Sequence, residues 1–279
     1  MVMDPKTLAR LVGPFLAEDV GRGDITTTAV VSEAASGRAR IEAREAAVIA
    51  GLPVAKACFD ELGGEVVDWQ PKVSDGTEVA AGDVLVVIEG PLRTILTGER
   101  TALNLLGHLS GVATRTAQLV AQISGTKARI VDTRKTTPGL RLLEKYAVRV
   151  GGGVNHRFGL DDAVLIKDNH IAAAGGVGVA VERAKQVVPH TVKVEAEVED
   201  LVGLDEAIAA GADSVLLDNM SPEQVGEAVE RAAGRVLLEV SGGIDVDNVR
   251  SYAQAGVDVI SVGAITHSAR TIDVALEVE

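Results

Sequence analysis

The stretch that decides the fold is VKVEAEVEDLVGLDEAIAAGADSVLLDN, residues 192–219. A Val-rich run with strand character is followed by an Ala- and Leu-rich helical segment and then by a second strand-like run. The same alternation continues on both sides, and a strand recurs about every twenty residues. Strands joined by a helix must pair in parallel, because the crossover needs the length of a helix to return. We therefore predict an α/β barrel, complete or incomplete, over residues 110–279.

The predicted barrel elements alternate along the chain. We expect strands at 128–133, 153–158, 163–168, 192–198, 214–219, 236–242 and 258–264, and helices at 115–123, 140–150, 176–188, 201–211, 221–234 and 245–256.

Residues 1–109 show a different pattern. Short Val-rich runs are separated by turn signals at Asp75–Gly76 and Gly82–Asp83, which is typical of antiparallel strands. This part is predicted to form an open α/β sandwich domain with a helix across it. The C-terminal segment 270–279 can pack back on that domain.

The composition excludes several classes of protein. The chain is 47% hydrophobic, enough for a large core, and the single Cys58 cannot form an intramolecular disulfide, so we expect a buried thiol in a reducing compartment. No apolar run approaches membrane-spanning length and the first residues lack a signal-peptide core, so we expect a cytoplasmic protein. Six scattered aromatic residues and a net charge of −13 argue against nucleic-acid binding.

One region departs from this acidity. Residues 131–170 contain seven Lys and Arg residues, several of them beside strand-like runs, which indicates a pocket for a small ligand with several negative charges. Barrels place their chemistry at the carboxyl ends of strands. The polar and glycine residues at those ends are Thr133, Arg134, Lys135, His156, Arg157, Lys167, Glu197, Asp218, Ser241, Gly242, Gly243, Gly263 and Ala264.

Carboxylates lie along one of these strands. Lys193, Glu195 and Glu197 alternate to one face, where burial would be costly without partners. Glu195 can form a salt bridge with Lys193 or with a cation of a neighbouring strand. Glu197 and Asp218 end adjacent strands, so they can hold Mg²⁺ or ribose hydroxyls and stabilise positive charge at an anomeric carbon.

Glycines follow two later strands. Backbone N–H groups at Gly242–Gly243 and at Gly263 can bind a phosphate closely because no Cβ intervenes, although a glycine pair after a strand is more often only a turn. His108, His170, His190 and His267 are expected to be structural, with no ligand spacing for zinc and no dinucleotide-binding motif.

Several motifs, in order, resemble one known family. DTRKTTPGLR (132–141), GGGVNHR (151–157) and LIKDNHI (165–171) are joined by matches at 18–27, 98–116, 194–200, 216–219, 240–244 and 262–268. Together they are similar to the quinolinate phosphoribosyltransferases, type II phosphoribosyltransferases of NAD biosynthesis. The resemblance implies a homodimeric, Mg²⁺-dependent enzyme that makes nicotinate mononucleotide, CO₂ and pyrophosphate from quinolinate and phosphoribosyl pyrophosphate.

The resemblance also implies a role for each matched residue. It assigns catalysis to Glu197, Asp218 and Lys135, with Mg²⁺ held by Glu197, Asp218 and the pyrophosphate. Quinolinate would contact Thr133, Arg134, His156, Arg157 and Lys167, and Arg100 would reach into the site of the partner subunit. Phosphoribosyl pyrophosphate would contact Lys135, Lys167, Glu197, Asp218, Ser241, Gly242, Gly243, Gly263 and Ala264.

Two rival functions stay open at this point. One is a sister pyrophosphorylase of the same fold with another acceptor, such as nicotinate. The other is a barrel lyase that uses Lys167 as a Schiff-base nucleophile, which requires a desolvated amine. Two guanidinium groups, a His and a Lys suit a dicarboxylate better than a monoacid.

Overall fold

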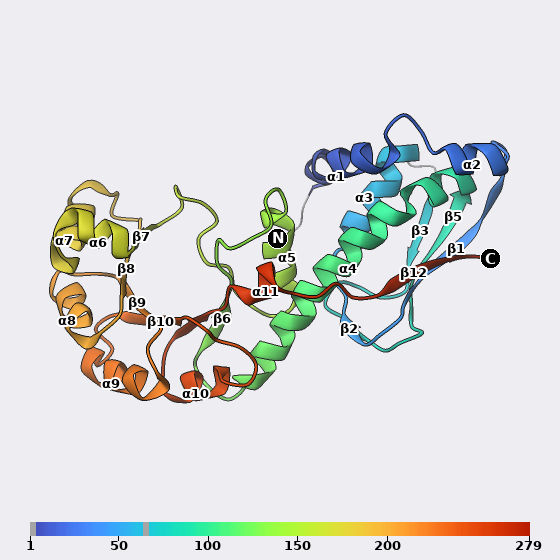
Figure 1. The fold of residues 1–279 in the computed structure, drawn as a ribbon. Coiled ribbons are helices and arrows are strands. Elements are labelled where there is room, and N and C mark those ends of the chain that lie inside the picture. The colour runs from blue at the N-terminus through green and yellow to red at the C-terminus, as the bar shows by residue number, and fades with distance from the viewer. Residues whose placement is uncertain (1–3, 64–66) are drawn as a thin grey trace. The chain divides into compact units, whose positions relative to one another are not determined.

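The computed structural model describes residues 4–63 and 67–279, and the chain divides into two compact units (Figure 1). The sandwich unit comprises Met1–Arg115, Leu142–Gly151 and Ala269–Glu279. The barrel unit comprises Thr116–Arg141 and Gly152–Ser268. The predicted class, an open sandwich followed by an α/β barrel, is confirmed.

The sandwich unit is built on an antiparallel sheet of strand order β12-β1-β5-β3. Ile41 of β1 and Leu85 and Ile88 of β5 are completely buried and form part of its core. Its strands are β1 (Ser36–Ala43), β2 (Ala47–Val48), β3 (Asp68–Pro71), β4 (Glu78–Val79), β5 (Val84–Pro91) and β12 (Val274–Val278). Its helices are α1 (Pro5–Val20), α2 (Ile25–Val30), α3 (Leu52–Gly63), most of α4 (Leu92–Gln122) and α5 (Arg141–Val150). Cys58 on α3 is fully buried, as predicted, and burial raises the pKa of its thiol to about 12.

The C-terminal segment returns to this unit and supplies β12, which pairs with β1. On the way it crosses α4 at Gly107 and Gly111, one helical turn apart. A Cβ atom at Gly111 would lie only 2.0 Å from the carbonyl oxygen of Arg270, so this crossing requires a residue without a side chain. The glycines in the sequence GHLSG are thus explained by packing.

Helix α5 belongs to the sandwich unit, although its position after the first barrel strand suggested a barrel helix. Its buried Glu144 lies 2.9 Å from His108, and the Tyr146 hydroxyl donates to Asp75 at 2.6 Å. The units therefore do not follow a single division between residues 109 and 110, which falls inside α4.

The barrel unit contains six parallel strands in the order β6-β11-β10-β9-β8-β7. They are β6 (Arg129–Val131), β7 (Val164–Ile166), β8 (Val194–Val198), β9 (Ser214–Asp218), β10 (Leu237–Ser241) and β11 (Val259–Ser261). The predicted strand at 153–158 is reduced to a bridge between Val154 and Val131. Because no described pairing joins this bridge to β7, the barrel is open there, which is the incomplete one of the two forms that the prediction allowed.

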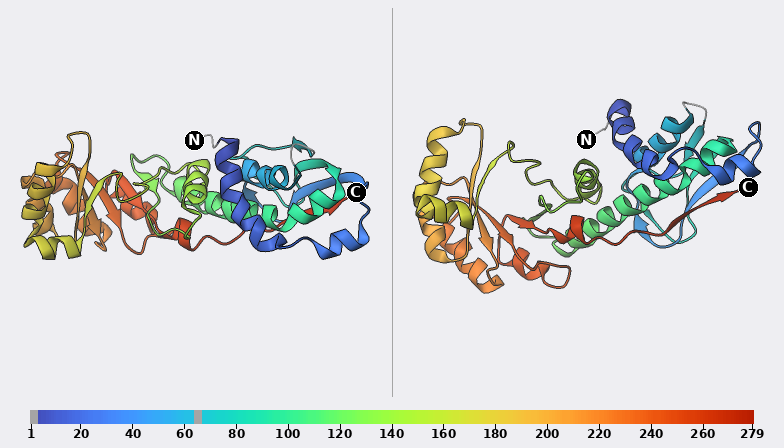
Figure 2. Two further views of the ribbon diagram at one scale, coloured as in Figure 1. Left: turned by 90° about the horizontal axis from the view of Figure 1, so that it is seen from above. Right: turned by 45° about the horizontal axis from the view of Figure 1, so that its top comes forward.

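Helices cover the outer side of this arc of strands (Figures 1 and 2). They are α6 (Asp168–Ala174), α7 (Val177–Val187), α8 (Leu201–Ala209), α9 (Pro222–Ala232) and α10 (Val249–Gln254). The short α11 (Ala264–His267) instead follows β11 at the carboxyl ends of the strands. Local sequence fixes where they begin: Asp200 accepts the N–H of Gly203, and Ser221 forms a capping box with Gln224 just before Pro222. Strands covered on both faces become almost continuously apolar, as β9 and β11 are.

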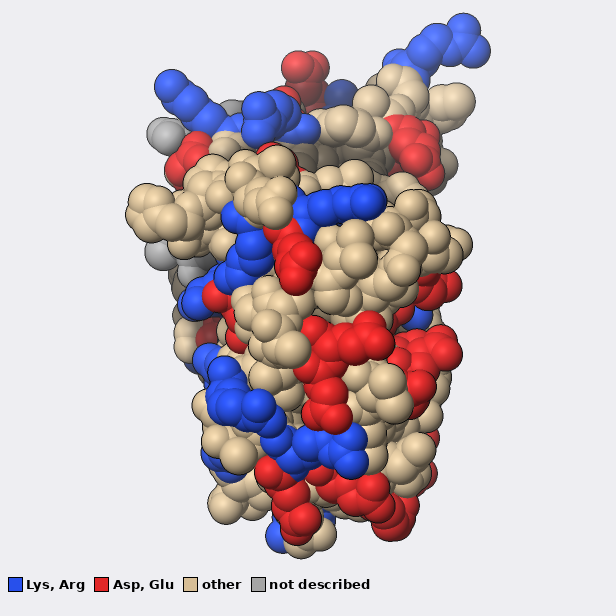
Figure 3. All heavy atoms as spheres, turned by 90° about the vertical axis from the view of Figure 1, so that its left-hand side faces the viewer, with Lys and Arg blue, Asp and Glu red and all other residues tan. Residues whose placement is uncertain are grey.

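The outer face that carries α7 and α8 shows acidic and basic side chains close together (Figure 3). Lys185 pairs with Asp213 at 2.7 Å and Arg231 with Asp205 at 2.9 Å. Such pairs belong to a solvated surface. Among the described residues, no helix is both long and apolar enough to cross a membrane.

Candidate functional site

A pocket of about 670 Å³ lies at the carboxyl ends of the barrel strands. Every strand-end residue that the sequence singled out lines it: Thr133, Arg134, Lys135, His156, Arg157, Lys167, Glu197, Asp218, Ser241, Gly242, Gly243, Gly263 and Ala264. The pocket lies entirely within the barrel unit. Its lining brings together cations from β6, β7 and the 153–158 loop, carboxylates from β8 and β9, and glycines after β10 and β11.

Two guanidinium groups form its most polar side. Arg134 follows β6 and Arg157 lies in the 153–158 loop, and the buried Nε atoms of both have no hydrogen-bond partner among the described residues. Burial, and then the charge of Arg134, lower the pKa of Arg157. Two like charges with unused donors are costly unless an anion neutralises them. This side is therefore suited to a ligand with more than one negative charge.

A Lys–Glu ion pair lies on the same rim. Lys167 follows β7 and contacts Glu197 near the end of β8. The Lys167 side chain is 46% exposed, whereas that of Glu197 is 13% exposed. Lys167 is thus a solvated, paired ammonium, unlike the desolvated amine that a Schiff-base enzyme needs.

Asp218 and the glycine loop after β10 are held together by Asn219. This residue adopts a left-handed φ of 55°; its N–H donates to Ser241 and its side chain donates to Asp218. Gly242 has a φ of +103°, and a Cβ there would lie 2.2 Å from the Asn219 side-chain oxygen. The loop can therefore place its backbone against the pocket only with glycine at this position. Asn219 was not among the site residues predicted from the sequence.

The last strand brings further groups to the pocket. A Cβ at Gly263 would lie 3.2 Å from the Lys135 side chain and 3.3 Å from the His267 ring, so all three approach closely. Thr266 donates to the carbonyl of Lys135 at 2.7 Å, which fixes the loop after β6 against α11. His267 was expected to be only structural, but it lines the pocket.

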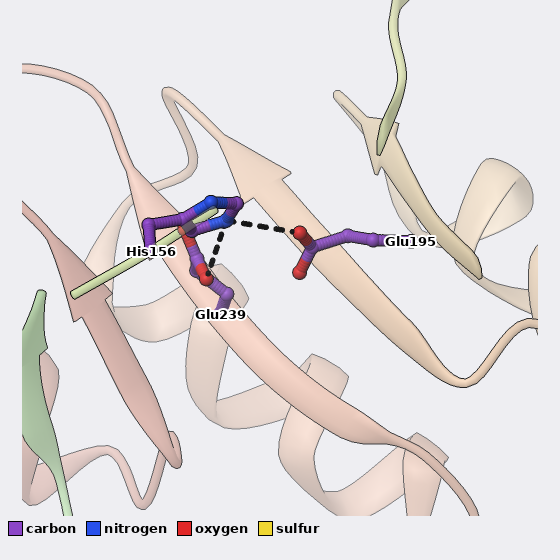
Figure 4. Close-up of side chains that lie close together, drawn as sticks. All are labelled: His156, Glu195 and Glu239. Atoms are coloured by element: carbon purple, nitrogen blue, oxygen red, sulfur yellow. Dashed lines mark hydrogen bonds and ion pairs between the residues drawn. The ribbon is translucent and has the colours of Figure 1, made fainter. Parts of the chain in front are cut away.

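The floor of the pocket contains a His between two carboxylates (Figure 4). His156 Nε2 lies 3.1 Å from Glu195 and 3.5 Å from Glu239, which come from β8 and β10. His156 Nδ1 accepts the N–H of Arg157, so the ring proton is on Nε2. Both ring nitrogens therefore already have partners within the protein. The suggested pairing of Glu195 with Lys193 is wrong, since Lys193 is exposed and lies 3.5 Å from Asp213.

Glu239 is the most unusual group of this cluster, and sequence analysis missed it. It is 3% exposed and its Oε1 has no hydrogen-bond partner among the described residues. Burial, and then the charge of Glu195, raise the pKa of Glu239 to about 7. The only sequence signal was a single Glu in the apolar run VLLEVS.

Asp132 anchors the loop that carries His156 and was also missed. It is fully buried, and it accepts the N–H of His156 at 2.9 Å and the side-chain amide of Asn155 at 2.6 Å. Because Asp132 directly follows β6, it ties this loop to the first strand of the barrel.

Arg100 lies on α4 in the sandwich unit. Its side chain is 62% exposed and lies 3.6 Å from Glu99. Its suggested role in a partner subunit stays a prediction. His170 lies outside the pocket lining and accepts the N–H of Lys167 through Nδ1.

Comparison with known proteins gives a consistent result over nearly the whole chain. The model of the quinolinate phosphoribosyl transferase N-terminal domain matches residues 24–110, and that of the C-terminal domain matches residues 112–277. A Bacillus subtilis protein, "probable nicotinate-nucleotide pyrophosphorylase (carboxylating)", is 42% identical over 99% of this chain and 95% of its own length. The Mycobacterium leprae nicotinate-nucleotide pyrophosphorylase (carboxylating) is 46% identical, covering 94% of each chain. The solved structure of the Francisella tularensis nicotinate-nucleotide pyrophosphorylase superimposes with a TM-score of 0.94 at 45% identity, covering 100% of this chain and 98% of that one.

Proposed function

The chain belongs to the quinolinate phosphoribosyltransferase family, and we propose that its barrel pocket transfers phosphoribosyl from phosphoribosyl pyrophosphate to quinolinate. The products are nicotinate mononucleotide, CO₂ and pyrophosphate, in a step of NAD biosynthesis. The observation that carries the proposal is the pair of Arg134 and Arg157, whose buried Nε donors lack partners in the described structure.

Quinolinate suits these guanidinium groups because it carries two adjacent carboxylates. Planar guanidinium forks bind carboxylates in two-point contacts, and a dianion offsets the mutual repulsion of the two cations. Lys167 adds a third positive charge to the lining of the same pocket. A monoacid such as nicotinate would leave part of this charge unneutralised, which favours quinolinate over a sister acceptor.

The glycine-rich part of the pocket lining suits phosphoribosyl pyrophosphate. The Gly242–Gly243 loop and Gly263 offer backbone N–H groups for the 5-phosphate, while Lys135 can approach either substrate. The pyridine nitrogen forms a bond to the anomeric carbon as the bond to pyrophosphate breaks, and positive charge develops on the ribose. Glu197 and Asp218 stabilise that charge, so that positioning and electrostatics supply the catalysis without a protein nucleophile.

The same two carboxylates are suited to Mg²⁺. They are oxygen ligands on adjacent strands, the type that Mg²⁺ prefers, with the pyrophosphate completing its coordination. The ion would offset the charge of the departing pyrophosphate. Lys167 also offsets negative charge at this place, through its ion pair with Glu197.

A direct assay tests this function. Purified protein with quinolinate, phosphoribosyl pyrophosphate and Mg²⁺ should yield nicotinate mononucleotide and CO₂ in equal amounts, and chelation of the metal should stop the reaction. Nicotinate should be a poor acceptor. Borohydride trapping of an aldehyde or ketone on Lys167 would instead support the lyase function.

We also propose a cytoplasmic homodimer in which Arg100 completes the site of the partner subunit. Mixing inactive Arg100→Ala and Glu197→Gln proteins after reversible dissociation should restore roughly a quarter of wild-type activity, because half of the dimers are mixed and each has one intact site. The Arg100→Ala protein alone is the control. Activity that stays at the level of the separate variants would show that Arg100 serves its own subunit.

A further inference from the structure

The proposed reaction requires a proton at one ring carbon. When CO₂ leaves, the bond between C2 of the pyridine ring and its carboxylate breaks, and the electron pair stays on C2 beside the positively charged nitrogen. That carbon must then take a proton to give the product. An acid close to the ring, away from bulk water, is therefore needed.

Arg134, Arg157 and Lys167 are poor candidates for this acid. Arg134 and Arg157 do not give up protons at neutral pH, and Lys167 is occupied by its pair with Glu197. His156 carries its one ring proton on Nε2, which is directed at Glu195 and Glu239 (Figure 4).

Glu239 has the required properties. Its carboxyl group is almost completely buried, lines the pocket, and has Oε1 without a partner among the described residues. We propose that Glu239 is the acid that protonates C2 after CO₂ leaves, an inference that rests on the function proposed above. The proton passes from the carboxyl group to the electron pair on C2, and the electrons of the broken O–H bond remain on the carboxylate.

The groups that face Glu239 favour its protonated form. Glu195 on β8 and Asp132 after β6 are negative, and both oppose a further negative charge in this buried place. His156 and the Ser261 hydroxyl on β11 act in the opposite direction, but more weakly than burial and Glu195. Together they raise the pKa of Glu239 to about 7, and a bound dianion would raise it further.

His156 stabilises Glu239 after this carboxyl group has lost its proton. Once Glu239 has lost its proton, the Nε2–H of His156 can donate to the new carboxylate as well as to Glu195. Solvent restores the proton after the product leaves. His156 thus acts as a positioning residue for the acid.

The test compares Glu239→Gln with wild type. The amide keeps the size of the side chain but cannot deliver the proton, so kcat should fall about 100-fold, the usual contribution of a general acid. Quinolinate affinity, measured by calorimetry, should stay within a few-fold. Wild-type kcat should fall as pH rises through a limb near or above 7, because only the protonated acid is active, and the variant should lack that limb.

Controls separate the possible outcomes. Glu230→Gln, an exposed change on α9, should alter nothing, and Glu239→Asp should recover part of the rate with the pH limb. Unchanged kcat in Glu239→Gln would overturn the proposal. A wild-type pH profile of kcat that is flat across neutral pH would also overturn it, and that measurement does not require Glu239→Gln to fold. Stoichiometric divalent metal held by His156, Glu195 and Glu239 would also overturn it, since a metal ligand carries no proton. Wild-type protein that makes no nicotinate mononucleotide would overturn the proposed function itself.

Discussion

Polar groups at the two ends of the barrel strands differ in whether they have hydrogen-bond partners. At the amino ends, Asp213 accepts the N–H of Val194 and pairs with Lys185, each at 2.7 to 2.8 Å. Asp258 accepts the N–H of Leu238 at 3.0 Å and pairs with Lys127 at 2.5 Å. In the pocket at the carboxyl ends, buried atoms of Arg134 and Arg157, and of Glu239 in the middle of β10, are left without partners in the described structure.

This difference separates stability from function within one sheet. Unpaired buried groups and adjacent like charges lower the free energy of unfolding, so they are retained at sites where ligand binding compensates for that loss. Mutations at the two ends should therefore affect different quantities: binding and rate at the carboxyl ends, and the free energy of unfolding at the amino ends.

The largest effect is expected from the rim carboxylates. Replacing Glu197 or Asp218 by its amide should lower kcat by roughly 100- to 1,000-fold, because the charge that they stabilise develops mainly in the transition state. The KM for quinolinate should change little. Asp258→Asn, at the amino ends, is the matched control and should keep kcat. A rim variant with near-normal kcat would remove that carboxylate from the mechanism.

The next largest effect is expected at Arg157, which we propose binds the carboxylates of quinolinate. Arg157→Ala should weaken quinolinate binding by roughly 2 to 4 kcal/mol, as calorimetry can measure, and should leave phosphoribosyl pyrophosphate binding largely intact. Its unfolding midpoint should not fall, because the variant relieves repulsion between the two neighbouring cations Arg134 and Arg157. Arg235→Ala, near the amino ends, should not alter quinolinate binding. Equal loss of both substrates would show that the basic residues have been misassigned.

Asp213→Asn, in contrast, should lower stability and leave substrate binding and rate unchanged. Losing charge-assisted hydrogen bonds to Lys185 and Val194 should lower the free energy of unfolding by about 1 to 3 kcal/mol without changing kcat. Burial opposes ionisation of Asp213, but these partners prevail and its pKa lies below 3.8. The stabilisation is therefore complete above pH 3.8 and is lost as pH falls through the lower folded value. Urea unfolding at neutral and acid pH should show the difference between variant and wild type narrowing in acid.

The smallest effect comes from two glycines. Gly242→Ala and Gly211→Ala both place a side chain at positive φ, +103° and +83°, which should cost about 1 kcal/mol of stability at Gly211 and more at Gly242, where the added Cβ would lie 2.2 Å from the Asn219 side-chain oxygen. Only Gly242 lines the pocket and adjoins Asn219, so only its variant should also bind phosphoribosyl pyrophosphate less tightly. Equal substrate affinity in the two variants would exclude the phosphate role of that loop.

Sequence could predict the pocket because parallel strands bring their carboxyl ends to one edge. Once residues such as Lys167, Glu197 and Asp218 were placed at strand ends, their convergence followed from the fold. The β8, β9 and β10 predictions were accurate for the same reason, since each apolar run was bounded by turn residues.

The rest depended on contacts that no local pattern encodes. Glu239 lies in the middle of a strand, and its importance comes from Glu195 and His156, which are far away in sequence. Helix α5 has the periodicity of any barrel helix, and its contacts from Glu144 to His108 and from Tyr146 to Asp75 show where it packs. Long-range pairs of this kind decide both the buried acid and the division into units.

The pairing of β12 with β1 has a consequence for how the chain is made. A ribosome completes β1 and β5 before any residue of the barrel unit from 116 onward, but it adds β12 only after all of them. Until then one edge of β1 exposes unpaired backbone groups, which can recruit another nascent chain. The sandwich unit, although it comes first in the sequence, is therefore finished last.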